Sequence, residues 1–247
     1  MKKVLLLSSG IDSHCAEYLS KPDVRVYFDT GQELCKQEIK AIKSQDYGDK
    51  VIIDDRFKLN DQVLSNDILP MRNAFFALAG AFYGDQMILV STAGDTTNDK
   101  DQPFVQYIND LFHHMFSNKS KNPDVSLDGA RLTIPYRNFT KTQLVEKYLK
   151  HGGSTEALLK TRSCYSEEEG ECGKCRSCIR KFVALKLNGQ ETEWNEDPMK
   201  HIEEAYNYAV KNDRKAEIND LAKLIIMTSL VNVPVLAALI NDSIVNL

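Results

Sequence analysis

The sequence lacks the two commonest glycine-rich nucleotide-binding motifs. Neither GxxxxGK[ST] nor GxGxxG occurs, which excludes a Walker-type phosphate loop and the dinucleotide fingerprint. It also has no long basic run, and its formal net charge is −4. Duplex nucleic acid is therefore not expected as the main partner, and no direct contact with nucleic acid is predicted. We find no internal repeat and no low-complexity tract.

Targeting and membrane signals are also missing. Met1, Lys2 and Lys3 lead into an apolar run too short for a signal core, and no small-residue cleavage pattern follows. We therefore expect a cytoplasmic protein. Residues 224–240 carry no charge, but the run is short for a membrane span and is interrupted by Pro234. Two buried helices that meet before Pro234 are expected, and no membrane partner. An apolar dimer face is the alternative, so a homodimer is possible.

The remaining pattern predicts an α/β fold. The chain has 247 residues, 43% of them hydrophobic and 27% charged, as in ordinary globular proteins. Helical segments alternate with apolar runs, which predicts a doubly wound, five-stranded parallel sheet. The predicted strands are residues 4–7, 24–28, 50–54, 87–91 and 131–134, and the predicted helices between and after them are residues 13–19, 33–45, 71–83, 103–116 and about 140–152. Ligands of such sheets bind beyond the carboxyl ends of the strands, so the loops after residues 7 and 91 should face one cleft, with residues 29–31 beside them.

Composition and motif position divide the chain into three parts. Residues 1–160 are predicted as a nucleotide-binding α/β domain and residues 161–190 as a metal-binding segment packed on it. From residue 191 the chain becomes acidic and helical, with helices expected at 198–211, 215–230 and 234–245. Residues 191–247 are therefore predicted as a helical C-terminal extension.

The segment after the first strand favours phosphate binding. Residues 8–13 read Ser-Ser-Gly-Ile-Asp-Ser, with the predicted helix following directly. The first N–H groups of a helix have no internal partner and lie at the positive end of its dipole. Gly10 would allow unusual backbone angles and a close approach to a ligand. The alternative is a plain strand–turn–helix connection with a serine cap.

Four of the six cysteines lie close together. Cys164, Cys172, Cys175 and Cys178 have the spacing C-x7-C-x2-C-x2-C, which can bring four thiolates around one tetrahedral ion. Four thiolates without an open position suit a structural zinc site. An iron–sulfur cluster or four free thiols are the alternatives. The metal should fix the loop to a helix over residues 176–187, and chelation should loosen that part of the fold.

Several motifs together resemble one enzyme family. Residues 8–13 resemble the SGGxDS loop of the PP-loop ATP pyrophosphatases, with Ser9 in place of a glycine. Residues 27–32 (YFDTGQ) are similar to the FDYGQ stretch of the 7-cyano-7-deazaguanine synthases (QueC-type), with Thr30 in place of tyrosine. Residues 69–73 (LPMRN) resemble their VPxRN motif, and residues 163–165 with 171–178 resemble their SCY and CGxCxSC zinc segment. The matches run in the family's order from residue 4 to about residue 187.

The chain departs from the family pattern at several places. A left-handed backbone at Ser9 would cost about 1 kcal/mol. The first interval between cysteines is one residue shorter than usual, and residues 94–99 only loosely match the family's acidic substrate loop. The tail after Pro198 is longer than expected.

The resemblance implies an ATP-dependent ligase of queuosine biosynthesis. Such enzymes convert 7-carboxy-7-deazaguanine and ammonia to 7-cyano-7-deazaguanine (preQ0) through adenylated intermediates, with ATP, Mg²⁺ and Zn²⁺ as cofactors. The alternatives are a PP-loop enzyme with another acceptor, either amide-forming or a tRNA-modifying sulfur transferase, and a non-catalytic nucleotide-binding homologue. A sulfur transferase would need a reactive cysteine near the ATP site, for which only Cys15 and Cys35 remain.

The resemblance also assigns site residues. Three residues are predicted as catalytic. Asp12 would be a magnesium partner or would brace the loop, and Asp29 would contact the nucleoside or ammonia. Arg72 would bind a phosphate or carboxylate through two parallel hydrogen bonds. The predicted cofactor-binding residues are Leu7, Ser8, Ser9, Gly10, Ile11, Asp12, Ser13, His14 and Asn73. The predicted zinc ligands are Cys164, Cys172, Cys175 and Cys178.

Most of these residues also have a structural interpretation. Asp29 could cap the helix at Glu33, Arg72 could be a surface charge, and His14 could be a packing residue. Basic residues around the last cysteines are expected to be solvated on the surface of their helix. They are Lys174, Arg176, Arg180 and Lys181.

Overall fold

The protein contains a five-stranded parallel sheet. The computed structural model describes residues 1–48, 51–65, 68–116 and 129–228. The strands are β1 (Lys3–Leu6), β2 (Val24–Phe28), β3 (Val51–Asp54), β4 (Gln86–Ile88) and β5 (Arg131–Thr133). Their order is β3-β2-β1-β4-β5, with every pair parallel. The predicted fold class is thus confirmed, and the strand order reverses between β1 and β4, the place at which a ligand cleft is predicted.

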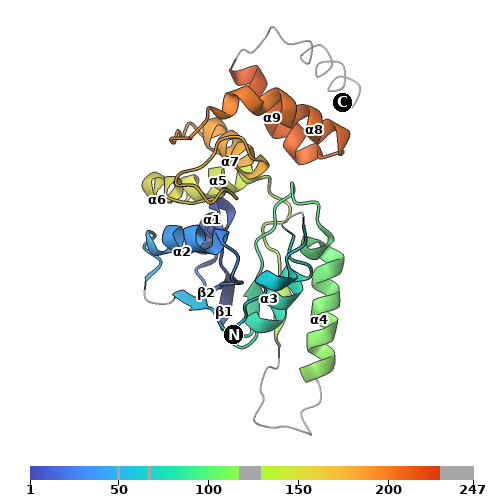
Figure 1. The fold of residues 1–247 in the computed structure, drawn as a ribbon. Coiled ribbons are helices and arrows are strands. Elements are labelled where there is room, and N and C mark those ends of the chain that lie inside the picture. Colours follow the sequence, from blue (N-terminus) through green and yellow to red (C-terminus); the bar gives the residue numbers. More distant parts are fainter. Residues whose placement is uncertain (49–50, 66–67, 117–128, 229–247) are drawn as a thin grey trace.

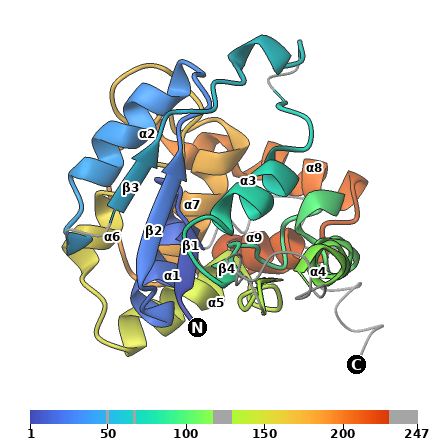
Figure 2. The ribbon, with the colours of Figure 1, turned by 90° about the horizontal axis from the view of Figure 1, so that it is seen from below.

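Helices cover both faces of this sheet (Figures 1 and 2). One face packs against α1 (Ile11–Ser20), α2 (Leu34–Lys43), α5 (Lys141–Lys150) and α6 (Thr155–Leu159). The other face packs against α3 (Arg72–Gly80) and α4 (Gln102–Phe116).

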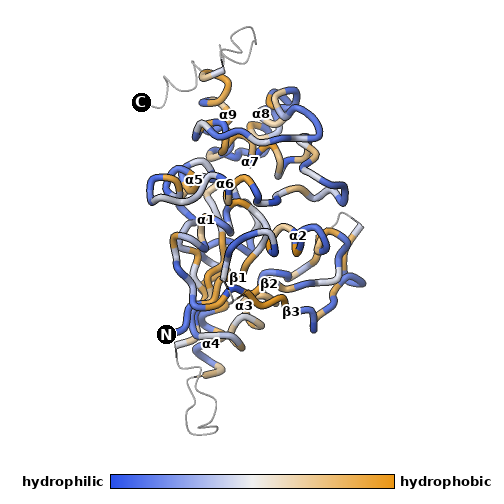
Figure 3. The backbone as a smooth tube through the Cα atoms, turned by 90° about the vertical axis from the view of Figure 1, so that its left-hand side faces the viewer, coloured by the Kyte–Doolittle hydropathy of each residue, from blue (hydrophilic) through white to orange (hydrophobic). Residues whose placement is uncertain are grey.

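Alternation along the central strand explains the two layers. Val4 and Leu6 of β1 enter one hydrophobic cluster, whereas Leu5 enters the other. Successive side chains of a strand point to opposite faces, so an apolar run without alternation feeds both cores. Figure 3 shows this concentration of hydrophobic residues in the central strands.

Helix α7 (Arg176–Leu187) joins the sheet layer to the C-terminal helices (Figure 1). Its Ala184 and Leu185 belong to the cluster on the sheet, while Ile179 and Val183 pack with α8 (Ile202–Lys211) and α9 (Lys215–Met227). The extension therefore rests on the same helix that carries the last cysteine of the cluster. The three-part division of the chain remains a prediction, since α7 shares a core with both of its neighbours.

Element boundaries differ from the predictions in small ways. Helix α1 begins at Ile11, two residues before the predicted start at Ser13. Helix α5 begins with a capping box, in which Gln143 N–H donates to Thr140 Oγ1 and Thr140 N–H donates to the Gln143 side chain. Three short 3-10 turns, Asn60–Gln62, Asn98–Lys100 and Pro198–His201, were not predicted, and the last delays the start of α8 to Ile202. The helix predicted at 234–245 lies outside the described residues.

Candidate active site and metal centre

The loop between β1 and α1 lies at the carboxyl edge of the sheet. Gly10 is the N-cap of α1 and has φ −72° and ψ 157°, an extended conformation open to any residue. The predicted need for unusual backbone angles at Gly10 is therefore wrong. The loop is held from within, since Ser8 N–H donates to Ser13 Oγ over 2.9 Å. The first N–H groups of α1 have no partner inside the helix, which is the arrangement expected for an anion site.

Ser9 is accommodated without strain. It is not among the residues with positive φ, so the expected penalty for a left-handed serine does not arise. Its hydroxyl lies 2.8 Å from Arg162 O and 3.1 Å from Glu38 Oε1, and its carbonyl accepts from Arg162 N–H over 2.9 Å. Ser9 is 3% exposed. The serine thus fastens the loop to residue 162, directly before the first cysteine-bearing segment.

Glu38 was not predicted as a site residue. Its carboxylate accepts hydrogen bonds from Tyr27 Oη (2.7 Å) and from Ser9. Burial raises the pKa of Glu38, while these hydrogen bonds and the nearby charges of Arg72 and Arg162 oppose the rise. Arg72 itself is exposed at the start of α3. The 11-residue separation of Tyr27 and Glu38 gives no recognisable sequence motif.

Asp12 lies in the first turn of α1, where Lys141 from the start of α5 contacts its Oδ2. Its Oδ1 is buried and accepts no hydrogen bond from the described residues. An ionised carboxylate carries only acceptor positions, and a buried oxygen without a donor is costly. Asp12 therefore has one oxygen available for a cation or a donor of a bound ligand.

A second charged group follows β4. Asp95 accepts from Thr92 N–H over 2.9 Å and pairs with Arg180 of α7 over 3.2 Å. Burial alone would raise the pKa of Asp95, but Lys100 and Arg180 hold it well below the usual range. The negative charge of Asp12 helps to raise the pKa of Arg180 against the effect of burial, so the loops after β1 and β4 share one electrostatic environment.

The expectation that the basic residues near the cysteines are all solvated is wrong for two of them. Lys181 is fully buried, and the Arg180 side chain is 20% exposed. Contacts with acidic residues distant in sequence explain the error. Arg180 pairs with Asp95 and Glu217, and Lys181 pairs with Glu171, whereas Lys174 and Arg176 remain exposed.

The other predicted residues lie at the same edge. Asp29, after β2, accepts from Gly31 N–H (2.9 Å) and Lys58 Nζ (2.5 Å). Burial alone would raise the pKa of Asp29, but the hydrogen bonds from Lys58 and Gly31 lower it. The cap of α2 is Glu33 without a side-chain hydrogen bond, so Asp29 does not cap that helix. Asn73 is buried and donates to Asp99 over 2.7 Å, which ties α3 to the loop after β4.

The His14 side chain is buried beside α5 and the segment that follows α2. Its ring nitrogens lie 3.0 Å from Tyr47 Oη and 3.0 Å from Tyr148 Oη, and burial lowers its pKa to about 4. Both nitrogens are thus engaged by tyrosines, which favours the packing role over contact with a nucleotide.

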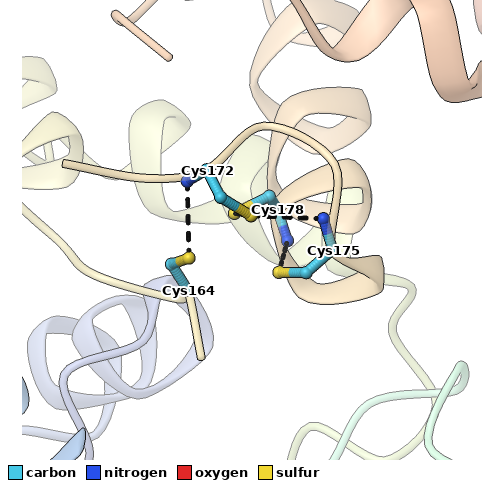
Figure 4. A group of neighbouring side chains, drawn as sticks. All are labelled: Cys164, Cys172, Cys175 and Cys178. Atoms are coloured by element: carbon cyan, nitrogen blue, oxygen red, sulfur yellow. Dashed lines mark hydrogen bonds between the residues drawn. The ribbon is translucent and has the colours of Figure 1, made fainter. Parts of the chain in front are cut away.

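The four predicted metal ligands converge (Figure 4). The Sγ atoms of Cys164, Cys172, Cys175 and Cys178 all lie within 4.8 Å of one another. Backbone N–H groups donate to three of the sulfurs at 3.3–3.5 Å, and these donors are Ser166, Cys172, Cys175 and Cys178. Gly173, with φ +78°, is required here, since a Cβ would lie 1.8 Å from Glu196 O. The cluster suggests zinc, because a tetrahedral ion with Zn–S bonds of about 2.3 Å separates its sulfurs by about 3.8 Å, and Cys172 Sγ lies 3.8 Å from Cys178 Sγ.

A buried ion pair braces the cysteine segment. Lys181 Nζ lies 2.5 Å from Glu171 Oε2 and donates to Thr161 O over 2.5 Å. Glu171 also accepts from Ser163 N–H over 2.7 Å. The Arg162 guanidinium donates to the carbonyls of residues 166, 168 and 170. Arg162 therefore holds the cysteine loop with its side chain and the phosphate loop with its backbone.

Comparison with known proteins identifies the family. The profile described as "Queuosine biosynthesis protein QueC" matches residues 32–189, more than half of the chain. The chain belongs to the QueC family. Family relatives named 7-cyano-7-deazaguanine synthase include that of Rickettsia africae, which is 31% identical in an alignment that covers 81% of this chain and 99% of the relative. That of Aliarcobacter butzleri is 25% identical in an alignment that covers 82% of this chain and 96% of the relative.

None of the helices in the described part of the chain has the length and hydrophobicity needed to cross a bilayer.

Proposed function

We propose that the protein is an ATP-dependent ligase that converts 7-carboxy-7-deazaguanine and ammonia to 7-cyano-7-deazaguanine. The acceptor carboxylate attacks the α-phosphate of ATP and pyrophosphate leaves. Ammonia then displaces AMP and gives the amide. Attack of the amide oxygen on a second ATP, followed by loss of that oxygen with AMP and loss of protons from nitrogen, gives the nitrile.

The residues at the edge of the sheet fit this chemistry. Such steps depend on positioning and on stabilisation of phosphate charge more than on a strong base. Ser8 N–H is engaged by Ser13 Oγ, so the N–H groups of residues 9–13 would bind the leaving pyrophosphate. Lys141 adds a positive charge beside Asp12. Arg72 would contact a phosphate or carboxylate, and Asp29 would hold the nucleoside or orient ammonia. Asn73 would orient the residues around it. ATP and Mg²⁺ remain part of the proposal.

The observation that carries the proposal is the buried, unpaired Oδ1 of Asp12 beside the phosphate loop. A hard cation such as Mg²⁺ prefers carboxylate oxygens, so this atom fits a metal that accompanies ATP phosphates. When bound, the ion would offset the charge of the pyrophosphate. The four cysteine sulfurs would hold Zn²⁺ in a closed structural site that supports the wall of the pocket.

A sulfur-transferase function receives less support. Cys15 is fully buried and Cys35 is 4% exposed. Burial, followed by the charge of Asp12, raises the pKa of the Cys15 thiol. A thiol buried and kept protonated in this way is a poor nucleophile.

The test is incubation with ATP, ammonia and 7-carboxy-7-deazaguanine, read by mass spectrometry. Nitrile and AMP from the wild type support the proposal. Asp12→Ala should abolish AMP release and leave the zinc content unchanged, while Asp110→Ala, an exposed change on α4, should retain activity. Amide as the sole product would indicate the amide-forming alternative, and an absence of AMP from the wild type would indicate a non-catalytic homologue.

A further inference from the structure

A cavity of about 320 Å³ lies between α7, the α8–α9 pair and the beginning of α5. Its apolar lining includes Ile179 and Val183 from α7, Ala205 from α8 and Leu221 from α9. Small-molecule sites have volumes of about 300–1,000 Å³ and mostly apolar walls with a few placed polar groups. The cavity therefore has room for a small ring system.

One wall of this cavity carries a buried carboxylate without a donor. Asp220 of α9 is 7% exposed and lines the cavity. Its Oδ1 accepts no hydrogen bond from any residue that the structure describes. Because an ionised carboxylate offers acceptors only, it would be satisfied by a ligand with neighbouring N–H groups.

Two basic residues that line the cavity also reach the site proposed for ATP. Lys141 lines the cavity and also contacts Asp12 in the first turn of α1. Arg180 lines it and pairs with Asp95 after β4. Gly94 permits this approach, since a Cβ there would lie 2.7 Å from Arg180 Nη2. A molecule in the cavity would thus have one end beside the phosphate loop.

Some charged side chains around the cavity are paired with an opposite charge, and others are not. Glu217 accepts from Arg176 over 2.5 Å and lies 3.4 Å from both Arg180 and Arg214, so it is already paired. Lys174, in contrast, lines the cavity and makes no ion pair within the described part of the chain. With Lys141, it gives the cavity positive groups suited to a ligand that is itself anionic.

We propose that this cavity binds the acceptor and that Asp220 accepts hydrogen bonds from N1–H and the 2-amino group of its guanine-like edge. The acceptor carboxylate then points to Lys141 and the phosphate loop. This inference rests on the proposed function. It gives α8 and α9, which lie beyond the matched residues 32–189, a part in substrate binding.

The direct test is Asp220→Asn, which replaces one acceptor oxygen by an NH₂ donor at nearly constant volume. We expect the dissociation constant of 7-carboxy-7-deazaguanine, measured by calorimetry, to rise roughly ten- to hundredfold, as for lost hydrogen bonds to a charged group. The KM for ATP should stay within about twofold, a smaller change than one lost hydrogen bond gives. Asp110→Asn on α4 is the matched control and should change neither value. Unchanged acceptor affinity in a folded Asp220→Asn variant would overturn the assignment.

A second measurement uses the wild type and does not depend on how the variant folds. An acceptor analogue without the 2-amino group should bind the wild type more weakly than the acceptor does. The analogue should also lose less affinity than the acceptor does when Asp220 is replaced by Asn, because the analogue has only the N1–H contact left to lose. Equal binding of acceptor and analogue to the wild type would show that the carboxylate does not contact this edge.

The two proposals fail in different ways. If the wild type releases no AMP with any acceptor, the proposed function fails. If the wild type makes the nitrile while Asp220→Asn keeps its KM for the acceptor, the ligase stands and only the cavity assignment falls.

Discussion

Hydrogen bonds of buried polar side chains fix the position of the phosphate loop. Ser9 fits an ordinary backbone conformation and shares its hydroxyl between Arg162 O and Glu38. His14, in α1 directly after the loop, is hydrogen-bonded to two tyrosines in the core. The sequence placed both residues at the loop but could not show which way they point, since a helix turns its side chains by about 100° per residue.

Burial of His14 should make stability depend on pH. Its pKa falls from 6.5 to about 4 on folding. Above pH 6.5 neither state binds a proton here, and between pH 6.5 and 4 mainly the unfolded chain does, so stability falls as the pH falls. The loss should reach about 3 kcal/mol near pH 4. Urea unfolding at several pH values measures it.

A variant without a titrating side chain at position 14 separates this pH effect from that of the carboxylates. His14→Gln should lack the extra loss between pH 6.5 and 4, whereas His113→Gln, an exposed change on α4, should keep it. Parallel pH curves for the wild type and His14→Gln would contradict the prediction.

Helix α7 links the cysteine cluster, the sheet and the C-terminal helices. Its first turn carries Cys178, and Cys175 is its N-cap. Donation from Cys178 lowers the pKa of the Cys175 thiol to about 5, which favours the thiolate that a metal requires. The cysteine spacing was sufficient to predict this cluster, because short C-x2-C steps leave few other arrangements.

Loss of one ligand should loosen the start of α7. Cys172→Ser is expected to remove bound zinc and to increase hydrogen exchange over residues 164–187, since metal binding and local folding are coupled. Metal analysis and exchange mass spectrometry measure the two effects. Cys35→Ser, outside the cluster, should keep one zinc per chain. Full zinc occupancy in Cys172→Ser would show that Cys172 is not a ligand.

The buried ion pair of α7 should be essential for stability. Lys181→Met leaves Glu171 charged and without its partner, which should cost about 3–5 kcal/mol. Burial lowers the pKa of Lys181, and Glu171 opposes that shift. Denaturant unfolding measures the loss. Lys186 is also on α7 and pairs with Glu191 at the surface. Lys186→Met should therefore cost less than about 1 kcal/mol.

At the scale of the whole molecule, the sheet was the most predictable feature. Apolar runs separated by helical segments specify parallel strands, and all five appear where the pattern indicated. The roles of Glu38, Lys141 and Arg180 were not predictable, because each reaches the site from a helix distant in sequence. Such contacts depend on how helices pack, which local periodicity does not encode.

The C-terminal helices should unfold together with the sheet. Leu224 of α9 is fully buried in the cluster that also contains Ile179 and Val183 of α7. Leu224→Ala should cost about 2–5 kcal/mol and lower the midpoint of one common transition. Circular dichroism and tryptophan fluorescence should report the same midpoint, since Trp194 packs beside the cysteine cluster. Ile226→Ala, at a site 62% exposed, is the control and should change stability little.

The hydrogen bonds from Arg162 to the cysteine loop have an evolutionary consequence. Its guanidinium binds three alternate carbonyls within the interval between the first two cysteines, so that interval has a fixed length as long as the arginine is present. An inserted residue would move these acceptors out of register and pull on the backbone that holds Ser9. Across descendants of this sequence, the identity of residue 162 and the length of the interval should change together.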